Sequence, residues 1–448
     1  MRLKAITTGL AVIALALTAT ACGSSTANAN TIKIVYRVYS DFPQMDDFMK
    51  SVKKEFEAAN PGVTAQLDPI TALDDYVTKV QLMQRSPSTA PDVLFEDSFY
   101  VNADAAAGYL LPLDDRLKSW PDWNQQFIDA TKQAGMAADG KTYAVPMSTD
   151  TRGLWFNKTV FTRAGLPTDW QPKTWDDVLA AARRIKETQP DVEPMFMPLG
   201  KPQAEAMSMQ TFEMLLYGTD TKDLYSTADK KWVAPSKGME DALGFVSTAV
   251  REHLTQTPAQ AEDTQWSQTQ MTTLMSQNKI GFMMDGGWYA RYWSPGGVSP
   301  WPEWSKVLGA TAFPTQHGQA PGKVTLSGGW TLAIGANTGN PDAAFKFVTT
   351  ALNRANSATI DVALSWLPAR KDVQTDPRLV EKDPTTPFWA SLLPITRYRP
   401  TMAEYPQVSN AIQVAGDAVL NGDDPHQAAR KWAEDVTKAV GADKTKAG

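Results

Sequence analysis

Apolar and polar positions near the start of the chain predict a repeated strand–helix unit, because runs of strand type alternate with stretches of helical periodicity. We expect strands at residues 31–36, 63–68 and 91–95, with helices between them at residues 46–60 and 73–85. This order predicts an open α/β sheet of right-handed βαβ units, whose ligands bind beyond the carboxyl ends of the strands. The first and third strands end near Asp41 and near Glu96 and Asp97, which are therefore candidate ligand contacts.

The later sequence repeats this alternation with longer helices. We expect helices at residues 175–188, 203–216, 236–253 and 268–277, strands at residues 279–284, 307–312 and 331–334, and a helical C-terminal third. Neither an internal repeat nor a low-complexity linker divides the chain. If the chain forms two lobes, we expect it to cross between them more than once.

The first 21 residues have the pattern of a secretion signal. A basic start precedes residues 9–21, which are uncharged, mostly apolar and too few to span a bilayer. The single cysteine, Cys22, follows at once and excludes an intrachain disulfide. Residues 19–25 resemble the lipobox of bacterial lipoproteins, which are cleaved before a lipid-modified cysteine. We therefore expect lipidation of Cys22, with residues 22–30 as a polar tether to the outer face of the cytoplasmic membrane.

The composition excludes several classes of protein. The chain has 448 residues, 43% of them apolar and 21% charged, and a net charge of −6. These values exclude a disordered, collagen-like or disulfide-framed chain, and the length suits two or three domains or two large lobes. No basic run is present, so we do not expect nucleic acid as a partner.

One segment matches the phosphate-binding loop of nucleotide hydrolases. Residues 135–142 carry its glycines, lysine and threonine, but a helical stretch precedes them and an alternating stretch ending at Pro146 follows. A phosphate-binding loop needs the reverse order, a strand before it and a helix after it. We therefore interpret Asp139 and Gly140 as a hairpin turn.

Other catalytic patterns are weak. The three histidines, His253, His317 and His426, are far apart in sequence and lack metal-ligand spacing, and no Gly-x-Ser-x-Gly motif is present. Adjacent acidic residues such as Glu96 and Asp97 point to opposite faces of a strand and so do not form a glycosidase pair. We expect no metal ion, no cofactor and no catalytic residue.

Tryptophan is the unusual component, since the chain has 15 tryptophans and 12 tyrosines. Many lie beside glycine or proline in predicted loops, as Trp288 and Tyr289 do after two glycines and Trp330 does after Gly328 and Gly329. A ring on such a loop can face a cleft, where aromatic faces stack on the C–H faces of sugars while polar neighbours bind the hydroxyls. The alternative is that these rings cover the ends of helices.

Five segments in order resemble the carbohydrate-type extracellular solute-binding proteins, the maltose-binding-like family that serves bacterial ABC importers. They are residues 91–93 with 108–113, residues 139–146, residues 146–161, residues 281–288, and residues 328–330 with 340–344. Trp155 and Phe156 replace the family's usual aliphatic residue and tyrosine before Asn157.

The resemblance implies a two-lobed periplasmic-binding-protein-like (type II) fold with crossing hinge strands, closing over its ligand by hinge motion. We expect residues 31–147 with about 313–329 to form the N-terminal lobe, and about 148–312 with 330–448 to form the C-terminal lobe. It also implies ligand contacts, namely Glu96, Asp97, Asp150, Trp288, Gly328, Gly329 and Arg399.

The function that the resemblance implies is the substrate-binding subunit of an ABC sugar importer. We expect a monomer that binds a mono- or oligosaccharide and delivers it unchanged to the transmembrane permease subunits. Three alternatives remain: a glycerol-phosphate-binding relative using Arg152, Arg397 or Arg399, a surface enzyme that cleaves carbohydrate, and a structural lipoprotein without a small ligand.

Overall fold

A five-stranded sheet forms the centre of the first lobe in the computed structural model, which describes residues 30–39, 42–71 and 73–448. Its strands run in the order β2 (Thr64–Ile70), β1 (Thr31–Arg37), β3 (Val93–Asp97), β14 (Trp330–Ile334) and β4 (Ala144–Pro146). β1 pairs in parallel with both β2 and β3, so the predicted βαβ arrangement is confirmed. β14 is antiparallel to its neighbours β3 and β4.

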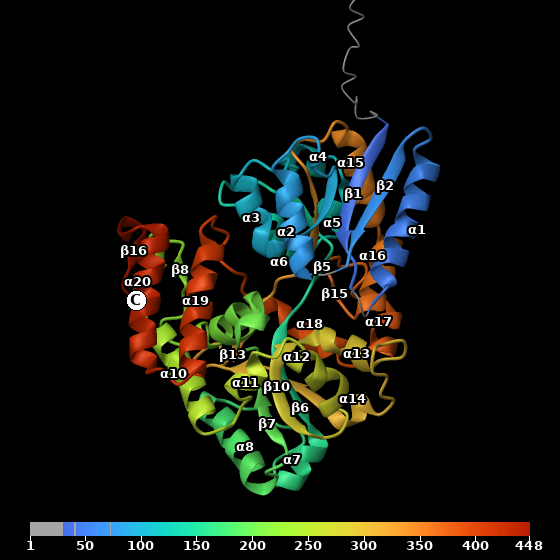
Figure 1. The fold of residues 1–448 in the computed structure, drawn as a ribbon. Coiled ribbons are helices and arrows are strands. Elements are labelled where there is room, and N and C mark those ends of the chain that lie inside the picture. Colours follow the sequence, from blue (N-terminus) through green and yellow to red (C-terminus); the bar gives the residue numbers. More distant parts are fainter. Residues whose placement is uncertain (1–29, 40–41, 72) are drawn as a thin grey trace, which may run out of the picture.

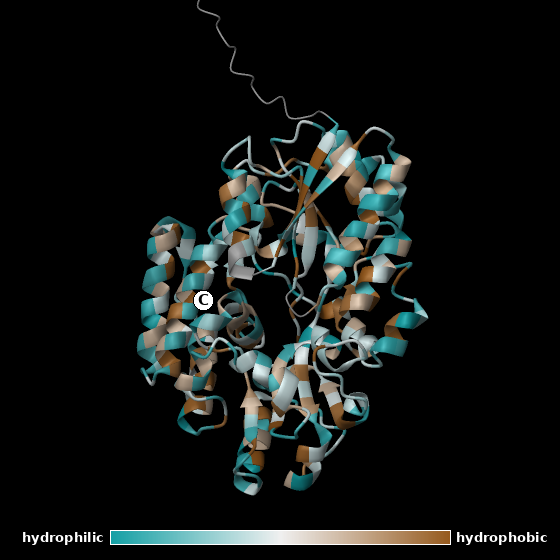
Figure 2. Ribbon diagram, turned by 45° about the vertical axis from the view of Figure 1, so that its right-hand side comes forward, coloured by the Kyte–Doolittle hydropathy of each residue, from teal (hydrophilic) through white to brown (hydrophobic). Residues whose placement is uncertain are grey.

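Amphipathic helices cover this sheet. They are α1 (Gln44–Ala59), α2 (Leu73–Gln84), α3 (Ser98–Ala106), α4 (Asp114–Lys118), α5 (Pro121–Gln125), α6 (Asp129–Lys132), α15 (Pro341–Ala351) and α16 (Arg354–Leu364). α1 buries Phe48, Val52 and Phe56, which recur at helical spacing, and packs against α15 and α16. Figure 2 shows hydrophobic residues on the strands and hydrophilic bands on the surrounding helices.

The second lobe is built on a four-stranded sheet in the order β11 (Leu308–Thr311), β6 (Arg152–Asn157), β10 (Ile280–Gly286) and β7 (Glu193–Phe196). Its longer helices are α7 (Lys158–Ala164), α8 (Trp175–Thr188), α10 (Lys237–Arg251), α19 (Tyr405–Leu420) and α20 (Pro425–Val440). α8 begins at a capping box in which Thr174 and Asp177 satisfy each other's backbone N–H groups. α10, α19 and α20 pack together at one side of this lobe (Figure 1).

Shorter elements complete the chain. The helices are α9 (Met214–Leu216), α11 (Pro258–Ala261), α12 (Trp266–Thr269), α13 (Ala290–Trp293), α14 (Trp304–Val307), α17 (Pro377–Lys382) and α18 (Thr386–Ser391). The strands are β5 (Ser148–Thr149), β8 (Tyr225–Ser226), β9 (Lys231–Val233), β12 (Phe313–Pro314), β13 (Lys323–Val324), β15 (Leu367–Pro368) and β16 (Thr445–Lys446). Within the described residues, no helix is long and apolar enough to cross a membrane.

The chain crosses between the lobes three times at a narrow waist, as expected for two lobes without a simple boundary (Figure 1). The first crossing contains β5, the second joins β13 to β14, and the third contains β15. β5 and β15 pair with each other in antiparallel fashion, so two of the crossings form one small sheet. The predicted two-lobed α/β fold with crossing strands is therefore confirmed.

The lobe boundaries differ from those that we expected. Residues 330–334 form β14 inside the first sheet, and α15 and α16 belong to the hydrophobic core of that lobe. Conversely, Phe313, Val324 and Leu326 belong to the core of the second lobe. The physical reason is the apolar run Leu332–Ile334, which is fully buried and therefore takes a central place between two strands.

Two predicted helices are interrupted by π-helical turns. Residues 203–216 contain the π-helical segment Met207–Glu213, and residues 268–277 contain Gln270–Leu274. Every residue of the first segment is buried, so it has no polar face of the kind that an amphipathic helix shows. The turn at Asp139 and Gly140 is confirmed, because Gly140 has φ +80° and the strand β4 follows in place of a helix.

We predict that Gly329→Ala destabilises the waist. Gly329 has φ +112°, and a Cβ atom there would lie 2.6 Å from the carbonyl oxygen of Ser148 on the neighbouring crossing. The free energy of unfolding should fall by about 1–3 kcal/mol in urea titrations. Gly244→Ala is the matched control, because a Cβ in this helical position meets no atom within 4 Å and should stabilise α10 by about 0.5–1 kcal/mol. Equal effects of the two changes would contradict the steric role of Gly329 at the waist.

Candidate ligand-binding cleft

A cavity of about 510 Å³ lies between the lobes, beyond the carboxyl ends of β1 and β3, where the sheet topology predicted a ligand site. Both lobes and the waist contribute to its lining. The polar and aromatic lining residues are Arg37, Tyr39, Thr78, Asp97, Phe99, Tyr100, Ser148, Thr149, Asp150, Arg152, Gln203, Glu205, Gln210, Trp288, Tyr289, Arg291, Trp330, Trp366 and Arg399. Seven of the predicted contacts thus line one cavity: Asp97, Asp150, Trp288, Tyr289, Gly329, Trp330 and Arg399.

Trp288 follows β10 in a short 3₁₀ turn and is half-buried in the cleft. Its position depends on the two preceding glycines. A Cβ atom at Gly286 would lie 1.8 Å from the Trp288 ring, and one at Gly287 would lie 2.6 Å from the Trp389 ring. The glycines therefore provide the space in which the indole folds back toward the cleft, as the sequence predicted.

The Trp288 ring also has a charged neighbour. The guanidinium carbon of Arg152 lies 4.9 Å from the ring centroid, in cation–π geometry. Arg152 thus lies over one face of the indole, and the Tyr289 ring lies beside it with centroids 5.9 Å apart.

Trp330 presents a second fixed aromatic surface at the start of β14. It pairs directly with Asp97 across the sheet, and its ring stacks on Phe95 with centroids 4.3 Å apart and planes 3° apart. Tyr76 contacts the same ring edge-on. These contacts hold the indole in one orientation, so that it can serve as a rigid binding surface.

Arg399 forms ion pairs with carboxylates of both lobes. It is 9% exposed and donates to Asp97 at 3.0 Å and to Ser98 at 2.8 Å in the first lobe, and to Glu205 at 3.0 Å in the second. Asp97 also caps α3, since its carboxylate accepts from the backbone N–H of Phe99. The predicted contacts Asp97 and Arg399 are thus placed together, and they bind each other.

Buried hydroxyl and carboxyl groups continue this network behind Arg399. The Tyr405 hydroxyl is within hydrogen-bonding distance of both Glu205 and Glu213, and the Tyr217 hydroxyl donates to Glu213 at 3.0 Å. Because the Tyr405 hydroxyl has one hydrogen, one of its two carboxyl partners must carry a proton. Burial, followed by the charge of Glu205, raises the pKa of Glu213 to about 7, and burial also raises the pKa of Glu205.

Asp150 lies at the waist and is also already bound. Its Oδ1 atom accepts from Arg152 at 2.5 Å and from the backbone N–H of Gly328 at 2.9 Å. Arg152 donates in addition to the carbonyl of Leu326. The N–H of Gly328 is consequently directed at Asp150, and Gly328, unlike Gly329, is not among the residues that line the cleft.

Two further predicted residues do not contribute to the described cleft. Glu96 is buried beside Tyr76 and Asp104 in a small pocket that Asp97 and Trp330 also line, and burial raises its pKa well above the usual value. Asp41 lies outside the described residues, as does Cys22.

Sequence reasoning missed several lining residues. Arg37 and Arg291 are not part of a recognisable sequence motif, and Glu205 lies in a segment whose pattern predicts an ordinary α-helix. Glu205 lies just before the π-helical segment, which also brings Met209 and Gln210 to the cleft. π-helical turns are frequent at functional sites, but their wider spacing does not appear in a hydrophobic pattern of helical period.

Of the three arginines considered for a phosphate ligand, two line the cleft and are engaged. Arg152 pairs with Asp150, and Arg399 pairs with Asp97 and Glu205. Arg397 pairs with Asp223 and is not among the lining residues.

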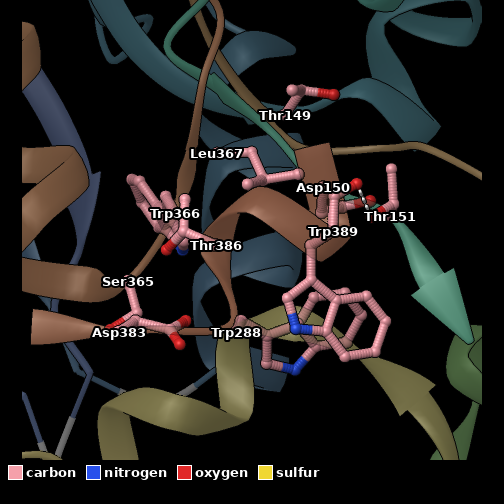
Figure 3. Close-up of a pocket in the computed structure, with 11 residues that line it drawn as sticks. Thr149, Asp150, Thr151, Trp288, Ser365, Trp366, Leu367, Asp383, Thr386 and Trp389 are labelled. Carbon is pink, nitrogen blue, oxygen red and sulfur yellow. Dashed lines mark hydrogen bonds between the residues drawn. The ribbon is translucent and has the colours of Figure 1, made fainter. Parts of the chain in front are cut away.

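A much smaller cavity of about 10 Å³ adjoins the cleft at the waist (Figure 3). It shares Asp150 and Trp288 with the cleft and is closed by Trp389 and Asp383. The Thr151 hydroxyl beside it donates to the carbonyl of Trp389 at 2.8 Å. This volume holds about one water molecule, so we assign it to the packing of the waist.

A family model described as bacterial extracellular solute-binding protein matches residues 39–358. The chain belongs to this family. The resemblance seen in the sequence is thereby confirmed, and the matched relatives are named as binding proteins. A putative binding protein of Brucella abortus is 25% identical over 276 residues, which are 62% of this chain and 61% of that protein. The diacetylchitobiose binding protein DasA of Streptomyces coelicolor is 25% identical over 399 residues, covering 88% and 87% of the two chains.

Solved structures agree on the fold. An ABC transporter solute-binding protein from Thermotoga lettingae, bound with α-D-tagatose, has a TM-score of 0.77 at 24% identity and covers 92% of this chain and 100% of its own. The GacH receptor of Streptomyces glaucescens, solved without ligand and with acarbose, has a TM-score of 0.75 at 22% identity, with 92% and 98% coverage.

We predict that Arg399→Met destabilises the protein strongly. The change leaves the partly buried carboxylates of Asp97 and Glu205 without their cation, which should cost about 3–5 kcal/mol of unfolding free energy. Arg397→Met is the control, because Arg397 is 36% exposed in its pair with Asp223 and should cost no more than about 1 kcal/mol. Urea unfolding of both variants checks this, and similar midpoints would contradict the role of Arg399.

We also predict a pH dependence that Glu213→Gln reduces. The pKa of Glu213 is raised from 4.5 to about 7 in the folded protein, so the native state binds more protons than the unfolded state between these values. The contribution of Glu213 to stability therefore falls as pH rises from about 4.5 to 7 and then levels off. Thermal melts of the Gln variant across this range should show a smaller fall than the wild type. An unchanged pH profile would show that Glu213 is charged throughout.

Proposed function

We propose that the protein is the substrate-binding subunit of an ABC sugar importer. It captures a mono- or oligosaccharide in the interlobe cleft and releases it intact to the permease. One observation carries this proposal: fixed aromatic faces, Trp288 and Trp330, line the same cavity as hydrogen-bonding groups from both lobes. Aromatic faces pack on the apolar faces of sugar rings, while hydroxyls need directional partners.

The names of relatives support a saccharide ligand. DasA is named for diacetylchitobiose, and a relative from Streptococcus mutans that is 25% identical over 169 residues is named multiple sugar-binding protein. The structures with similar folds contain tagatose, acarbose and maltose. These ligands differ in size. They therefore support a saccharide as the class of ligand, and experiment must determine how many sugar units it contains.

Closure of the lobes supplies the capture step. A saccharide that contacts both lobes binds the closed form better than the open form and so shifts the equilibrium toward it. Exclusion of water from the cleft then strengthens each hydrogen bond.

The chemistry of the cleft favours binding without reaction. Asp97 and Asp150 each accept a hydrogen bond from an arginine, which suits them as fixed charges. A glycosidase needs one of its two carboxyl groups as a proton donor to the leaving oxygen. We therefore propose reversible binding, with Cys22 as the lipid anchor and the permease subunits as the protein partners.

A thermal-shift screen of the mature chain against mono-, di- and trisaccharides tests the proposal. A ligand that binds the native state raises the melting temperature, by an amount set by its concentration relative to Kd. We expect at least one saccharide to do so and to be recovered uncleaved after prolonged incubation. Recovery of shortened products would favour the enzyme alternative, and a flat response to every saccharide would reject the proposal.

Trp288→Ala should weaken binding of the saccharide identified in that screen. Loss of the stacking surface should cost about 1.5–3 kcal/mol, or about ten- to hundredfold in Kd, measured by titration calorimetry. Trp120→Ala is the control, because Trp120 is half-buried in the first lobe and is not a residue of the cleft. Unchanged affinity in the Trp288 variant would remove this residue from the site.

A further inference from the structure

We infer that the cleft is built for a saccharide carrying a negatively charged group, a carboxylate or a phosphate, which Arg37 and Arg291 hold between them. This inference rests on the proposed function and specifies the class of its ligand. It assigns a role to two side chains that neither the motifs nor the ion pairs of the cleft account for.

The two arginines face the cavity from opposite lobes. Arg37 is the last residue of β1 in the first lobe, and Arg291 lies in α13, three residues after Trp288, in the second. Both are half-buried. Their guanidinium carbons lie 4.2 Å and 5.4 Å from the centroid of the same ring, that of Tyr39. The fold thus places two cations against one ring of the cleft lining.

These charges lack a visible counter-ion. Among the residues that the structure describes, neither Arg37 nor Arg291 forms an ion pair, and the Nε atom of each is buried without a hydrogen-bond partner. The carboxylates that line the cleft are Asp97, Asp150 and Glu205, and each of them is paired with Arg152 or Arg399.

The charge balance of the cleft therefore differs from that of the whole chain. Four arginines and three carboxylates line the cavity, whereas the full sequence has a net charge of −6. Two like charges that are partly removed from water repel each other, and an anion placed between them relieves this cost. The guanidinium fork also matches the oxygens of carboxylate and phosphate groups in a bidentate manner.

Aromatic contacts position the guanidinium groups but do not neutralise them. Arg37 also lies 5.7 Å from the Trp330 ring, and Arg291 lies 4.7 Å from Phe42 and 5.4 Å from Tyr292. Cation–π contacts are weaker than an ion pair at half-buried sites and leave the N–H donors free to bind. A neutral sugar offers hydroxyl oxygens only, so it leaves both charges uncompensated.

Titration calorimetry of the mature chain with matched neutral and acidic sugars tests the inference. Three pairs differ by carboxylate groups: galactose and galacturonic acid, glucose and glucuronic acid, and galactobiose and digalacturonate. A fourth pair, glucose and glucose 6-phosphate, differs by a phosphate group, so the comparison of pairs shows which of the two anions the cleft prefers. We expect at least one acidic member to bind about tenfold tighter than its neutral partner. This preference should shrink between about 50 mM and 500 mM salt, because ions screen partly exposed charges.

Arg37→Gln and Arg291→Gln locate the effect. Each should reduce the affinity for the acidic member about tenfold or more and change that for the neutral member much less. Arg430→Gln is the matched control, since Arg430 is exposed on α20 and is not a residue of the cleft. The melting temperature of each variant shows whether it is folded. If a variant does not fold, the comparison of acidic and neutral sugars with the wild-type protein still tests the inference.

The outcomes separate this inference from the proposed function. Neutral sugars that bind as tightly as their acidic partners, or tighter, would overturn the inference and leave the proposed function intact. An acidic preference that survives both glutamine variants would place the anion elsewhere and also overturn it. If no saccharide binds, charged or neutral, both proposals are wrong.

Discussion

The binding cleft depends on the waist, where three segments of the chain pass between two separately packed cores. β5 and β15 pair there, and Gly329 approaches Ser148 so closely that no side chain fits at its position. Each lobe has its own cluster of buried hydrophobic residues, and the cavity lies between them. We propose that the lobes move as rigid bodies about the few residues of the waist.

Ion pairs determine what that cavity can bind. The three carboxylates that line the cleft, Asp97, Asp150 and Glu205, can accept hydrogen bonds from sugar hydroxyls, yet each is already paired with an arginine of the cleft. Their remaining lone pairs can still accept, but their charge is compensated within the protein. The aromatic faces and the arginines near Tyr39 are lining groups outside these ion pairs, and for that reason we propose that they determine the specificity of the cleft.

Local patterns were sufficient for most of the fold. The first five elements and the helix at residues 175–188 follow from hydrophobic period and caps, because each has one buried face. The place of residues 330–334 did not follow, since an apolar strand fits the centre of either sheet and only tertiary pairing decides between them. The π-helical segment Met207–Glu213 was missed for a related reason, as all of its residues are buried and none marks a polar face.

The site was predictable where a residue follows a strand or a glycine pair. Asp97 and Trp288 are examples of lining residues found in this way, whereas Glu96 is buried beside Tyr76 and Asp104 and is not among the residues that line the cleft. Arg37 and Arg291 could not be identified from the sequence as candidate ligand contacts. They stand out only because the other charged side chains of the cleft form ion pairs, and the three-dimensional structure is needed to see those pairs.

A crystal structure of the mature chain grown with the saccharide that raises its melting temperature most is the most direct measurement. We predict density for an intact sugar between the lobes, in contact with Trp288 and with residues of both lobes. Density on the outer surface of one lobe, with the cleft occupied by solvent alone, would contradict capture between the lobes.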